Sequence, residues 1–264
     1  MIAIVGAGKM GEALLAGFLG TGYTPADVLV TESRREHAQD LWERFGVESV
    51  DVATAARRAD TLVLAVKPQD MVALLNELSG VVDSRHLVIS VAAGVTTDVL
   101  EKHLGGEVAV VRAMPNTPAL RGVGMTALAA GTHATAEALD RTERLLRTVG
   151  DVVRVQERHM DTVTAISGSG PAYIYFVAET MVEAGVAMGM PRDIAQHLVS
   201  QTITGAAEML RESGEHPVML REAVTSPGGT TAAALRELER DGVRAAFTNA
   251  IEAAGNRSRQ LSEG

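Results

Sequence analysis

The 264-residue chain contains no cysteine, so its fold has no disulfide bond and its chemistry has no thiol nucleophile or thiolate metal ligand. The seven histidines are scattered without a paired spacing, and we therefore expect no bound metal. No block of basic residues occurs and the formal net charge is -9, which argues against nucleic acid and anionic membrane surfaces as partners. No apolar run approaches the ~18 residues of a membrane span.

The remaining composition is that of a globular protein with a substantial core, because 46% of the residues are apolar and 22% are charged. The length predicts one or two domains. The chain opens directly on the apolar run Ile2–Val5, without a basic region or a cleavage site, so we expect a strand here rather than a signal peptide. A cytoplasmic location is the resulting expectation.

Short apolar runs alternate with helical patterns in the first part of the chain. Runs that are apolar on both faces and alternate with helices predict βαβ units and a parallel sheet. The expected strands are residues 2–5, 28–31, 61–66, 87–91, 108–113, 125–129 and 152–155. The expected helices are residues 9–19, 34–45, 53–59, 69–78, 97–104 and 136–148. We therefore predict an α/β fold whose N-terminal domain, residues 1–155, is of Rossmann type, with a doubly wound, mainly parallel sheet.

From residue 156 onward the pattern contains helices only, separated by Gly and Pro, which predicts an all-α C-terminal domain over residues 156–264. Its expected helices are residues 160–166, 172–188, 192–212, 217–224, 231–240 and 243–261. About 110 residues of helix rich in Ala and Gly bury little by themselves, so we favour burial against a partner subunit. A compact monomeric bundle packed on the first domain is the alternative.

The segment Gly6-Ala7-Gly8-Lys9-Met10-Gly11 lies between the first expected strand and the first expected helix. This is the context that the dinucleotide-binding fingerprint requires. The first glycine makes the turn, the second lets the backbone approach the pyrophosphate, and the third lets helix and strand pack closely. We predict a nicotinamide dinucleotide at this turn.

The end of the second strand bears on the choice of cofactor. Glu32 lies about 20 residues past the turn, where an acidic side chain accepts a hydrogen bond from the ribose of NAD. Ser33, Arg34 and Arg35 follow, and they suit the 2′-phosphate of NADP. We favour NADPH and keep NADH as the alternative; one of the two arginines is equally explained as a solvated residue of the next helix.

Other loops should border the cofactor, because ligands of open α/β sheets lie at the carboxyl ends of the strands. Lys67 can reach a ribose or phosphate oxygen, and small residues after the next strand leave room for the nicotinamide. Asn116, held between two prolines, can offer hydrogen bonds to cofactor or substrate. These candidates are Ala65, Val66, Lys67 and Pro68, then Ala92, Ala93 and Gly94, and finally Asn116.

A second turn, Ser226-Pro227-Gly228-Gly229-Thr230-Thr231, precedes an expected helix in the C-terminal part. Backbone N–H groups at a helix N-terminus suit a carboxylate or a phosphate, so this turn is a candidate site for an anionic substrate. A helix cap without a ligand explains the same residues. The lysines are Lys9, Lys67 and Lys102, so the C-terminal domain has none to serve as the acid–base of an alcohol dehydrogenase. Reduction of a C=N bond needs less, because an iminium is already electrophilic.

Three motifs together resemble the pyrroline-5-carboxylate reductase family. They are Met-Pro-Asn-Thr-Pro from Met114, Gly-Ser-Gly-Pro-Ala-Tyr from Gly168, and the long segment from Leu220 to Leu235 that contains the second turn. The resemblance runs from residue 2 to about residue 260. It implies hydride transfer from NAD(P)H to the C=N bond of 1-pyrroline-5-carboxylate, giving L-proline in the last step of proline biosynthesis.

The resemblance also implies a helical dimerisation domain, and hence a homodimer or a higher homo-oligomer with an active site at the subunit interface. It assigns the substrate carboxylate to Ser226, Gly228, Gly229 and Thr230, and the imine nitrogen to Thr231 as the catalytic hydroxyl. Two alternatives stay open: an oxidoreductase similar to the β-hydroxyacid dehydrogenases, and a dinucleotide-binding protein without catalysis.

Overall fold

The computed structural model describes residues 1–263, which divide into two compact units. The first unit comprises residues 1–169 together with the C-terminal segment from Ala254, and the second comprises Gly170–Ala253. The domain boundary expected at residue 155 stays a prediction.

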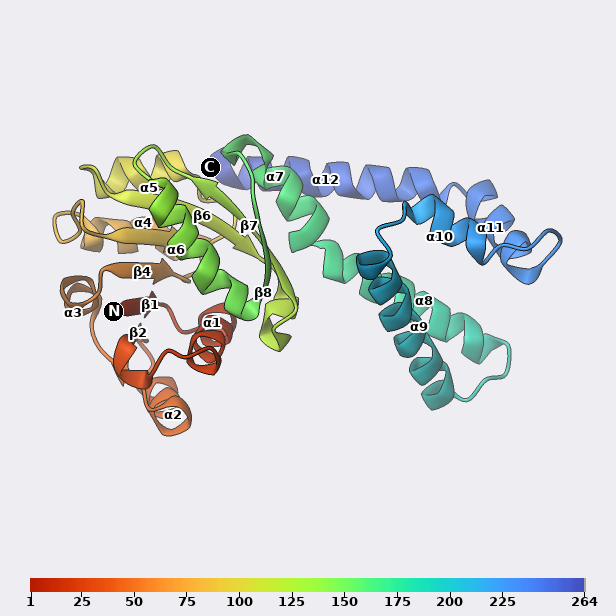
Figure 1. The fold of residues 1–264 in the computed structure, drawn as a ribbon, viewed down its shortest axis with the longest axis horizontal. Coiled ribbons are helices and arrows are strands. Elements are labelled where there is room, and N and C mark those ends of the chain that lie inside the picture. The colour runs from red at the N-terminus through yellow and green to blue at the C-terminus, as the bar shows by residue number, and fades with distance from the viewer. Residues whose placement is uncertain (264) are drawn as a thin grey trace. The chain divides into compact units, whose positions relative to one another are not determined.

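The first unit contains a sheet of eight strands in the order β3-β2-β1-β4-β5-β6-β7-β8 (Figure 1). All neighbouring pairs are parallel except β6 and β7, which are antiparallel. The strands are β1 (Ile2–Val5), β2 (Val28–Thr31), β3 (Glu48–Ser49), β4 (Thr61–Leu64), β5 (Leu87–Ser90), β6 (Ala109–Pro115), β7 (Gly124–Ala130) and β8 (Gly150–Arg154). The predicted doubly wound, mainly parallel sheet is confirmed.

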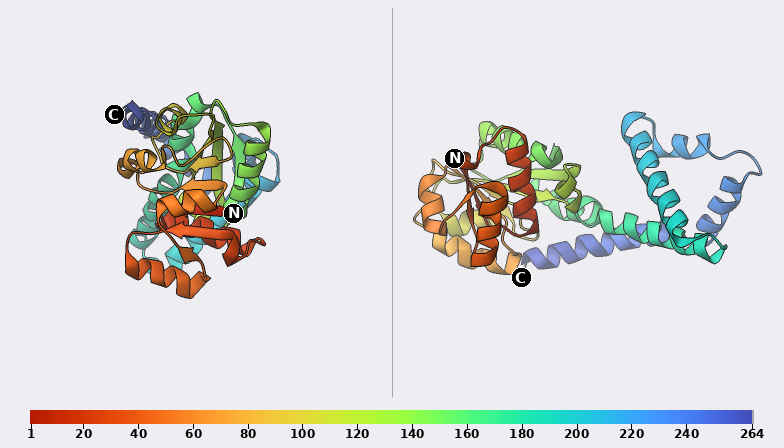
Figure 2. Two further views of the ribbon diagram at one scale, coloured as in Figure 1. Left: turned by 90° about the vertical axis from the view of Figure 1, so that its left-hand side faces the viewer. Right: turned by 90° about the horizontal axis from the view of Figure 1, so that it is seen from below.

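Helices cover both faces of this sheet (Figure 2). On one face of the sheet, strand side chains pack with leucines of α1, α2 and α6 and with Phe18 of α1. On the other face, they pack with apolar residues of α3, α4 and α5. Because strands β1, β2 and β4 are buried on both faces, their sequences are continuous apolar runs rather than alternating ones. The helices are α1 (Lys9–Gly20), α2 (Arg35–Phe45), α3 (Val52–Arg58), α4 (Pro68–Leu78), α5 (Thr97–Leu104) and α6 (Ala136–Leu146).

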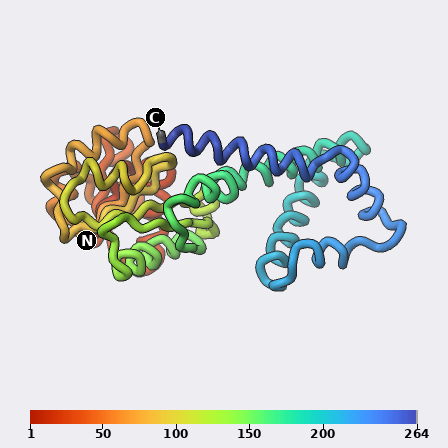
Figure 3. Tube along the Cα trace, turned by 90° about the horizontal axis from the view of Figure 1, so that it is seen from above, coloured from red at the N-terminus to blue at the C-terminus, as the bar shows by residue number. Residues whose placement is uncertain are grey.

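The C-terminal segment of α12 (Val243–Glu263) returns to the first unit, as the blue end of the tube in Figure 3 shows. There the hydroxyl of Ser258 donates to Asp161 Oδ1 over 2.7 Å, and Ser258 is buried. Asp161 lies in α7 (Met160–Val163), which continues into the π-helical turn Thr164–Gly168. The last part of α12 thus belongs to a unit whose strands lie about a hundred residues earlier in the sequence.

The second unit is entirely helical. It contains α8 (Gly170–Ala187), α9 (Arg192–Glu212), α10 (Pro217–Ala223), α11 (Thr230–Arg240) and the first part of α12. The small hydrophobic cluster of this unit is Val182, Ala195 and Val199, which joins α8 to α9. Large apolar side chains on the same helices are exposed, among them Phe176, Ile194 and Leu198.

The expected element boundaries differ from the observed ones by a few residues in most cases. One difference is larger: the edge strand β3 is not among the expected elements, because Glu48 and Ser49 are polar and exposed and leave no apolar signal. The helix expected over residues 136–148 ends slightly earlier, at Leu146, and is followed by the 3-10 turn Arg147–Val149.

Candidate functional site

The loops predicted to bind the cofactor follow β1, β2, β4, β5 and β6, which are parallel to their neighbours in this part of the sheet. Their carboxyl ends therefore lie at one edge of the sheet. The structure places the cofactor candidates there: residues 6–11 after β1, 33–35 after β2, 65–68 after β4, 92–94 after β5 and Asn116 after β6. Their predicted contacts with a ligand stay predictions.

The three glycines of the first turn have three different surroundings. Gly6 has a φ of 93°, and a Cβ on it would lie 2.9 Å from Val66 Cγ1. A Cβ on Gly11 would overlap the carbonyl oxygen of Gly6. A Cβ on Gly8 would meet nothing within 4 Å, so the space beside this backbone is open.

This pattern fits a bound dinucleotide. Gly6 and Gly11 are required by the turn and by the contact between β1 and α1, whereas nothing inside the protein requires Gly8. The open space at Gly8 lies at the N-cap of α1, where Glu12 N–H makes the first helical bond to Gly8 O over 2.8 Å. The N–H groups before Glu12 precede the hydrogen-bond ladder and suit a pyrophosphate.

The turn is fixed by contacts with β2 and α2. Gly6 N–H donates to the backbone oxygen of Thr31 over 3.2 Å and to its hydroxyl over 3.3 Å. From α2, the ring nitrogen Nε2 of His37 lies 2.7 Å from the carbonyl oxygen of Ala7. His37 lies outside the glycine-rich motif, so no sequence pattern identifies it as part of this turn.

At the end of β2, Glu32 pairs with Arg34. The carboxylate accepts from Arg34 N–H over 2.9 Å, from Nε over 3.2 Å and from Nη2 over 3.1 Å. Burial acts to raise the pKa of Glu32, but the hydrogen bonds and the charge of Arg34, helped by His37, outweigh it and hold that pKa below its usual range. The guanidinium of Arg34 is exposed. An arginine beside a neutralised carboxylate is available to a 2′-phosphate.

Asn116 makes contacts inside the protein. Its Oδ1 accepts from Met125 N–H over 2.8 Å, and its Nδ2 donates to Ser167 O over 3.0 Å. The amide therefore ties the end of β6 to the start of β7 and to the π-helical turn. This gives Asn116 a structural role that the sequence did not reveal.

Arg112 is a second residue that sequence reasoning missed. It lies in β6, is buried at 2% exposure, and its Nη1 is 2.5 Å from Glu157 Oε1. An ion pair inside the unit connects the sheet to the segment that leads out of β8. A charged residue in an otherwise apolar strand is the signal that could have drawn attention to it.

In the second unit, residues 226–229 form a β-turn of type II. Gly229 N–H donates to Ser226 O over 3.0 Å, Pro227 precedes Gly228, and Gly228 has a φ of 71°. Gly229 is the N-cap of α11, and the first helical bond runs from Ala233 N–H to Gly229 O over 3.1 Å. Thr230 and Thr231 occupy the first turn of this helix, whose leading N–H groups precede the ladder.

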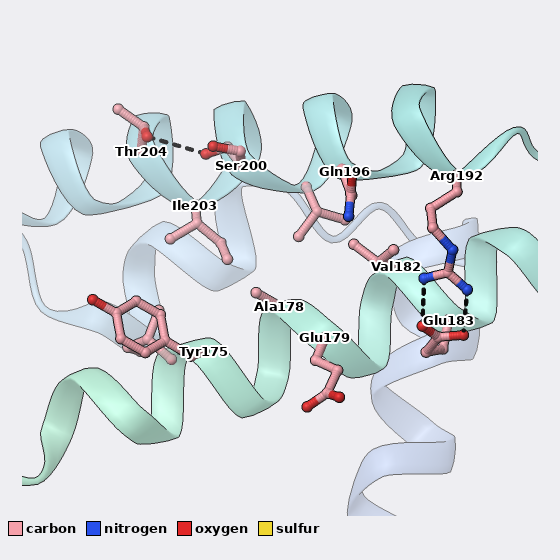
Figure 4. Close-up of a pocket in the computed structure, with 12 residues that line it drawn as sticks. Tyr175, Ala178, Glu179, Val182, Glu183, Arg192, Gln196, Ser200, Ile203 and Thr204 are labelled. Atoms are coloured by element: carbon pink, nitrogen blue, oxygen red, sulfur yellow. Dashed lines mark hydrogen bonds and ion pairs between the residues drawn. The ribbon is translucent and has the colours of Figure 1, made fainter.

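The helical unit also carries a groove of about 530 Å³ between α8 and α9. Figure 4 shows Tyr175, Ala178 and Val182 facing this space, and the ion pair of Arg192 with Glu183 at one end. The two guanidinium–carboxylate bonds measure 2.6 and 3.0 Å. An open groove with an apolar floor is typical of a surface that a second protein chain covers.

Among residues 1–263, no helix is long and apolar enough to cross a membrane. Within the same range, no group of three or more His, Cys, Asp or Glu side chains is arranged to hold a metal ion.

The fold and the glycine-rich turn define a dinucleotide-binding oxidoreductase of the Rossmann class. Residues 1–94 match the family model described as NADP oxidoreductase coenzyme F420-dependent. Residues 157–261 match the model described as pyrroline-5-carboxylate reductase dimerisation. The chain is 42% identical to the pyrroline-5-carboxylate reductase of Corynebacterium melassecola, over 99% of this chain and 98% of the relative. The chain belongs to the pyrroline-5-carboxylate reductase family.

Solved structures agree with this assignment. The pyrroline-5-carboxylate reductase of Coxiella burnetii matches with a TM-score of 0.92 and 38% identity, covering 99% of this chain and 98% of that one. The Plasmodium falciparum enzyme, solved with NADP bound, matches with a TM-score of 0.89 and 30% identity over 99% and 97% of the two chains. The chain therefore has the family's fold along almost its whole length, including a dimerisation domain.

Proposed function

We propose that this chain is a pyrroline-5-carboxylate reductase that uses NADPH to reduce 1-pyrroline-5-carboxylate to L-proline. The observation that carries the proposal is the match to named reductases over 99% of the chain, at 42% identity in sequence and a TM-score of 0.92 in structure. The open backbone at Gly8 and the exposed Arg34 support a dinucleotide with a 2′-phosphate. NADPH supplies the hydride.

The residues of the second turn are proposed to hold the substrate. The leading N–H groups of α11, with Ser226, Gly228, Gly229 and Thr230, bind the carboxylate, because a helix N-terminus favours an anion. The Thr231 hydroxyl makes a hydrogen bond with the ring nitrogen. The hydride adds to the carbon of the C=N bond, the π electron pair of that bond becomes the lone pair of the nitrogen, and the proton of the amine comes from solvent. Because the carboxylate and the ring nitrogen are both bound, the orientation of the small ring is fixed relative to the cofactor, which lowers the entropic cost of hydride transfer.

We propose that the chain works as a homodimer or a higher homo-oligomer through its helical domain, in the cytoplasm. The exposed apolar side chains of α8 and α9 support the assembly, since the buried hydrophobic cluster of this unit is small. The match of the dimerisation model from residue 157 supports a division into residues 1–155 and 156–264. Molar mass from light scattering tests the assembly, and a mass of 27.7 kDa would contradict it.

The activity is tested by following NADPH absorbance with purified protein and 1-pyrroline-5-carboxylate. We expect oxidation of NADPH that depends on the substrate and yields proline in equal amount. A panel of 3-hydroxy acids with NADP⁺ is the control for dehydrogenase chemistry, and we expect no turnover with it. Turnover of the hydroxy acids without turnover of the pyrroline would overturn the proposal.

A further inference from the structure

His37 of α2 contacts both loops that are proposed to recognise the dinucleotide: Ala7 in the loop after β1 and Glu32 in the loop after β2. We propose that His37 is a positioning residue that anchors the glycine-rich turn and makes selection of the 2′-phosphate depend on its own protonation. The inference rests on the proposed NADPH site. It concerns a residue outside the fingerprint, and it predicts a proton-linked choice between NADPH and NADH.

The first contact of His37 is with the glycine-rich turn. Its Nε2 is 2.7 Å from the carbonyl oxygen of Ala7, and a carbonyl oxygen only accepts hydrogen bonds, so Nε2 carries a proton. Ala7 is buried, and His37 is half-buried with 22% of its side chain exposed. A fixed side chain therefore holds the backbone of the turn from the outside, three residues into α2.

The second contact of His37 is with Glu32. Nε2 lies 3.7 Å from Glu32 Oε2, the same oxygen that accepts from Arg34 Nη2 over 3.1 Å. The carboxylate is thus shared between a permanent cation and a ring that becomes a cation on protonation. Only 7% of the Glu32 side chain is exposed, so water does little to replace a lost partner.

Other charged groups near the ring do not take over this role. Nδ1 of His37 lies 4.0 Å from Asp40 Oδ2 on α2, but Arg44 Nη1 already donates to that oxygen over 2.9 Å. Arg44 in turn pairs with Glu12 of α1. The Asp40 side chain is 46% exposed and the Glu32 side chain 7%, so water screens Asp40 more, and Glu32 responds more strongly to the charge of His37.

A 2′-phosphate changes this balance. The phosphate binds the guanidinium of Arg34, which also neutralises Glu32. A protonated His37 is a second cationic partner for Glu32, so Arg34 can bind the phosphate while the charge of the carboxylate stays compensated. Histidine changes charge in the physiological pH range. NADH has no 2′-phosphate and places no such demand on Arg34, so the preference for NADPH should weaken as the pH rises.

Two variants separate the anchor from the charge. His37→Gln keeps an N–H that can reach Ala7 but does not titrate, and His37→Ala removes both functions. We measure KM for NADPH and for NADH between pH 6 and pH 8. The second ionisation of the 2′-phosphate, near pH 6, acts in the opposite direction but equally in every variant, so the comparison with His37→Gln removes it.

The preference for NADPH is the KM for NADH divided by the KM for NADPH. From pH 6 to pH 8 we expect this ratio to fall about threefold more in the native chain than in His37→Gln, which is the effect of one partly screened charge. His37→Ala should raise KM for both cofactors at every pH. Equal pH profiles in the native chain and His37→Gln, or unchanged KM values in His37→Ala, would overturn the proposal. His37→Asn replaces the first variant if it does not fold.

A binding measurement separates this inference from the proposed reaction. Trp42, the one tryptophan of the chain, lies on α2 five residues beyond His37 and is 55% exposed, so its fluorescence can report ligands at this loop. The probes are 2′,5′-ADP and 5′-AMP. A preference for 2′,5′-ADP that falls more from pH 6 to pH 8 in the native chain than in His37→Gln supports the inference even where pyrroline reduction fails. An equal pH dependence of this preference in the two proteins refutes it even where reduction succeeds.

Discussion

Arg112 in β6 and Glu157 just after β8 form an ion pair inside the first unit, with 2.5 Å between Nη1 and Oε1. The Arg112 side chain is 2% exposed, and its Nε and Nη2 have no hydrogen-bond partner among residues 1–263. The guanidinium thus depends on one carboxylate for its neutralisation. Removing one partner of a buried pair costs more than removing both, because it leaves a charge without compensation.

We therefore expect Glu157→Gln to lower the free energy of unfolding by about 2–4 kcal/mol, and Arg112→Met combined with Glu157→Leu to lower it by less. Urea unfolding at pH 7 measures both. Arg85→Met removes an exposed partner of Asp83 and is the control, with an expected change of about 0.5 kcal/mol or less. A double variant less stable than Glu157→Gln would contradict this account of the pair.

Asp60 gives the stability a dependence on pH. Its carboxylate accepts from Arg141 Nη2 over 2.5 Å and from the Thr61 hydroxyl over 3.0 Å, and it lies 3.5 Å from the N-terminal amine. Burial acts to raise the pKa of Asp60, but these hydrogen bonds and charges outweigh it and hold that pKa below its usual value.

A carboxylate with a lowered pKa in the folded state stabilises the fold above its unfolded pKa, and loses that contribution as the pH falls through the folded value. We expect Asp60→Asn to be less stable than the native chain at pH 7, and the difference to shrink below about pH 4. Urea unfolding across this range provides the measurement. A difference that stays constant down to pH 3 would mean that the charge of Asp60 contributes nothing.

The sequence predicted those parts of the fold that depend on local pattern. The strands β1, β2 and β4 are buried on both faces, which matches their mainly apolar sequences. Gly6 and Gly11 are required by the turn that the spacing predicts. The alternation of these runs with helical patterns predicted the parallel sheet. The long segment around Ser226–Thr231 indicated the resemblance to the reductase family.

Contacts between distant residues left no such pattern. Asn116 was expected to face a ligand, and its amide also bonds Ser167, 51 residues further along the chain. Nothing near Arg112 indicates that Glu157 neutralises it. His37 lies outside every motif, yet it contacts Ala7 across 30 residues. Such pairs depend on how strands and helices are arranged, which composition and periodicity do not specify.

We predict that Arg34 and Arg35 determine the preference for NADPH over NADH. Arg34 is exposed and paired with Glu32, so it can offer its outer N–H groups to a 2′-phosphate. Arg34→Ala together with Arg35→Ala should raise KM for NADPH about tenfold or more and leave KM for NADH within about twofold, because NADH lacks that phosphate. Arg57→Ala, on α3, is the control. An unchanged preference would mean that other residues recognise the phosphate.

Gly8 and Gly11 should respond differently to alanine. A methyl group at Gly8 meets nothing in the protein, so Gly8→Ala should keep the stability within about 1 kcal/mol while it blocks the approach of the pyrophosphate. A methyl group at Gly11 overlaps Gly6 O, so Gly11→Ala should lower both stability and NADPH affinity. Thermal unfolding and NADPH titration distinguish them. Normal NADPH binding by Gly8→Ala would contradict the proposed path of the cofactor.

Thr231 tests the proposed chemistry. It is the second residue of α11, where its hydroxyl is proposed to hold the ring nitrogen of the substrate. Thr231→Ala should lower kcat by about 10- to 100-fold, as for the loss of one hydrogen bond that orients the reacting group, and leave the Kd for NADPH within about twofold. Thr231→Ser keeps the hydroxyl and should retain most of the activity. If Thr231→Ala turns over at a near-normal rate, the nitrogen is held by another group, and the helix N-terminus alone accounts for substrate binding.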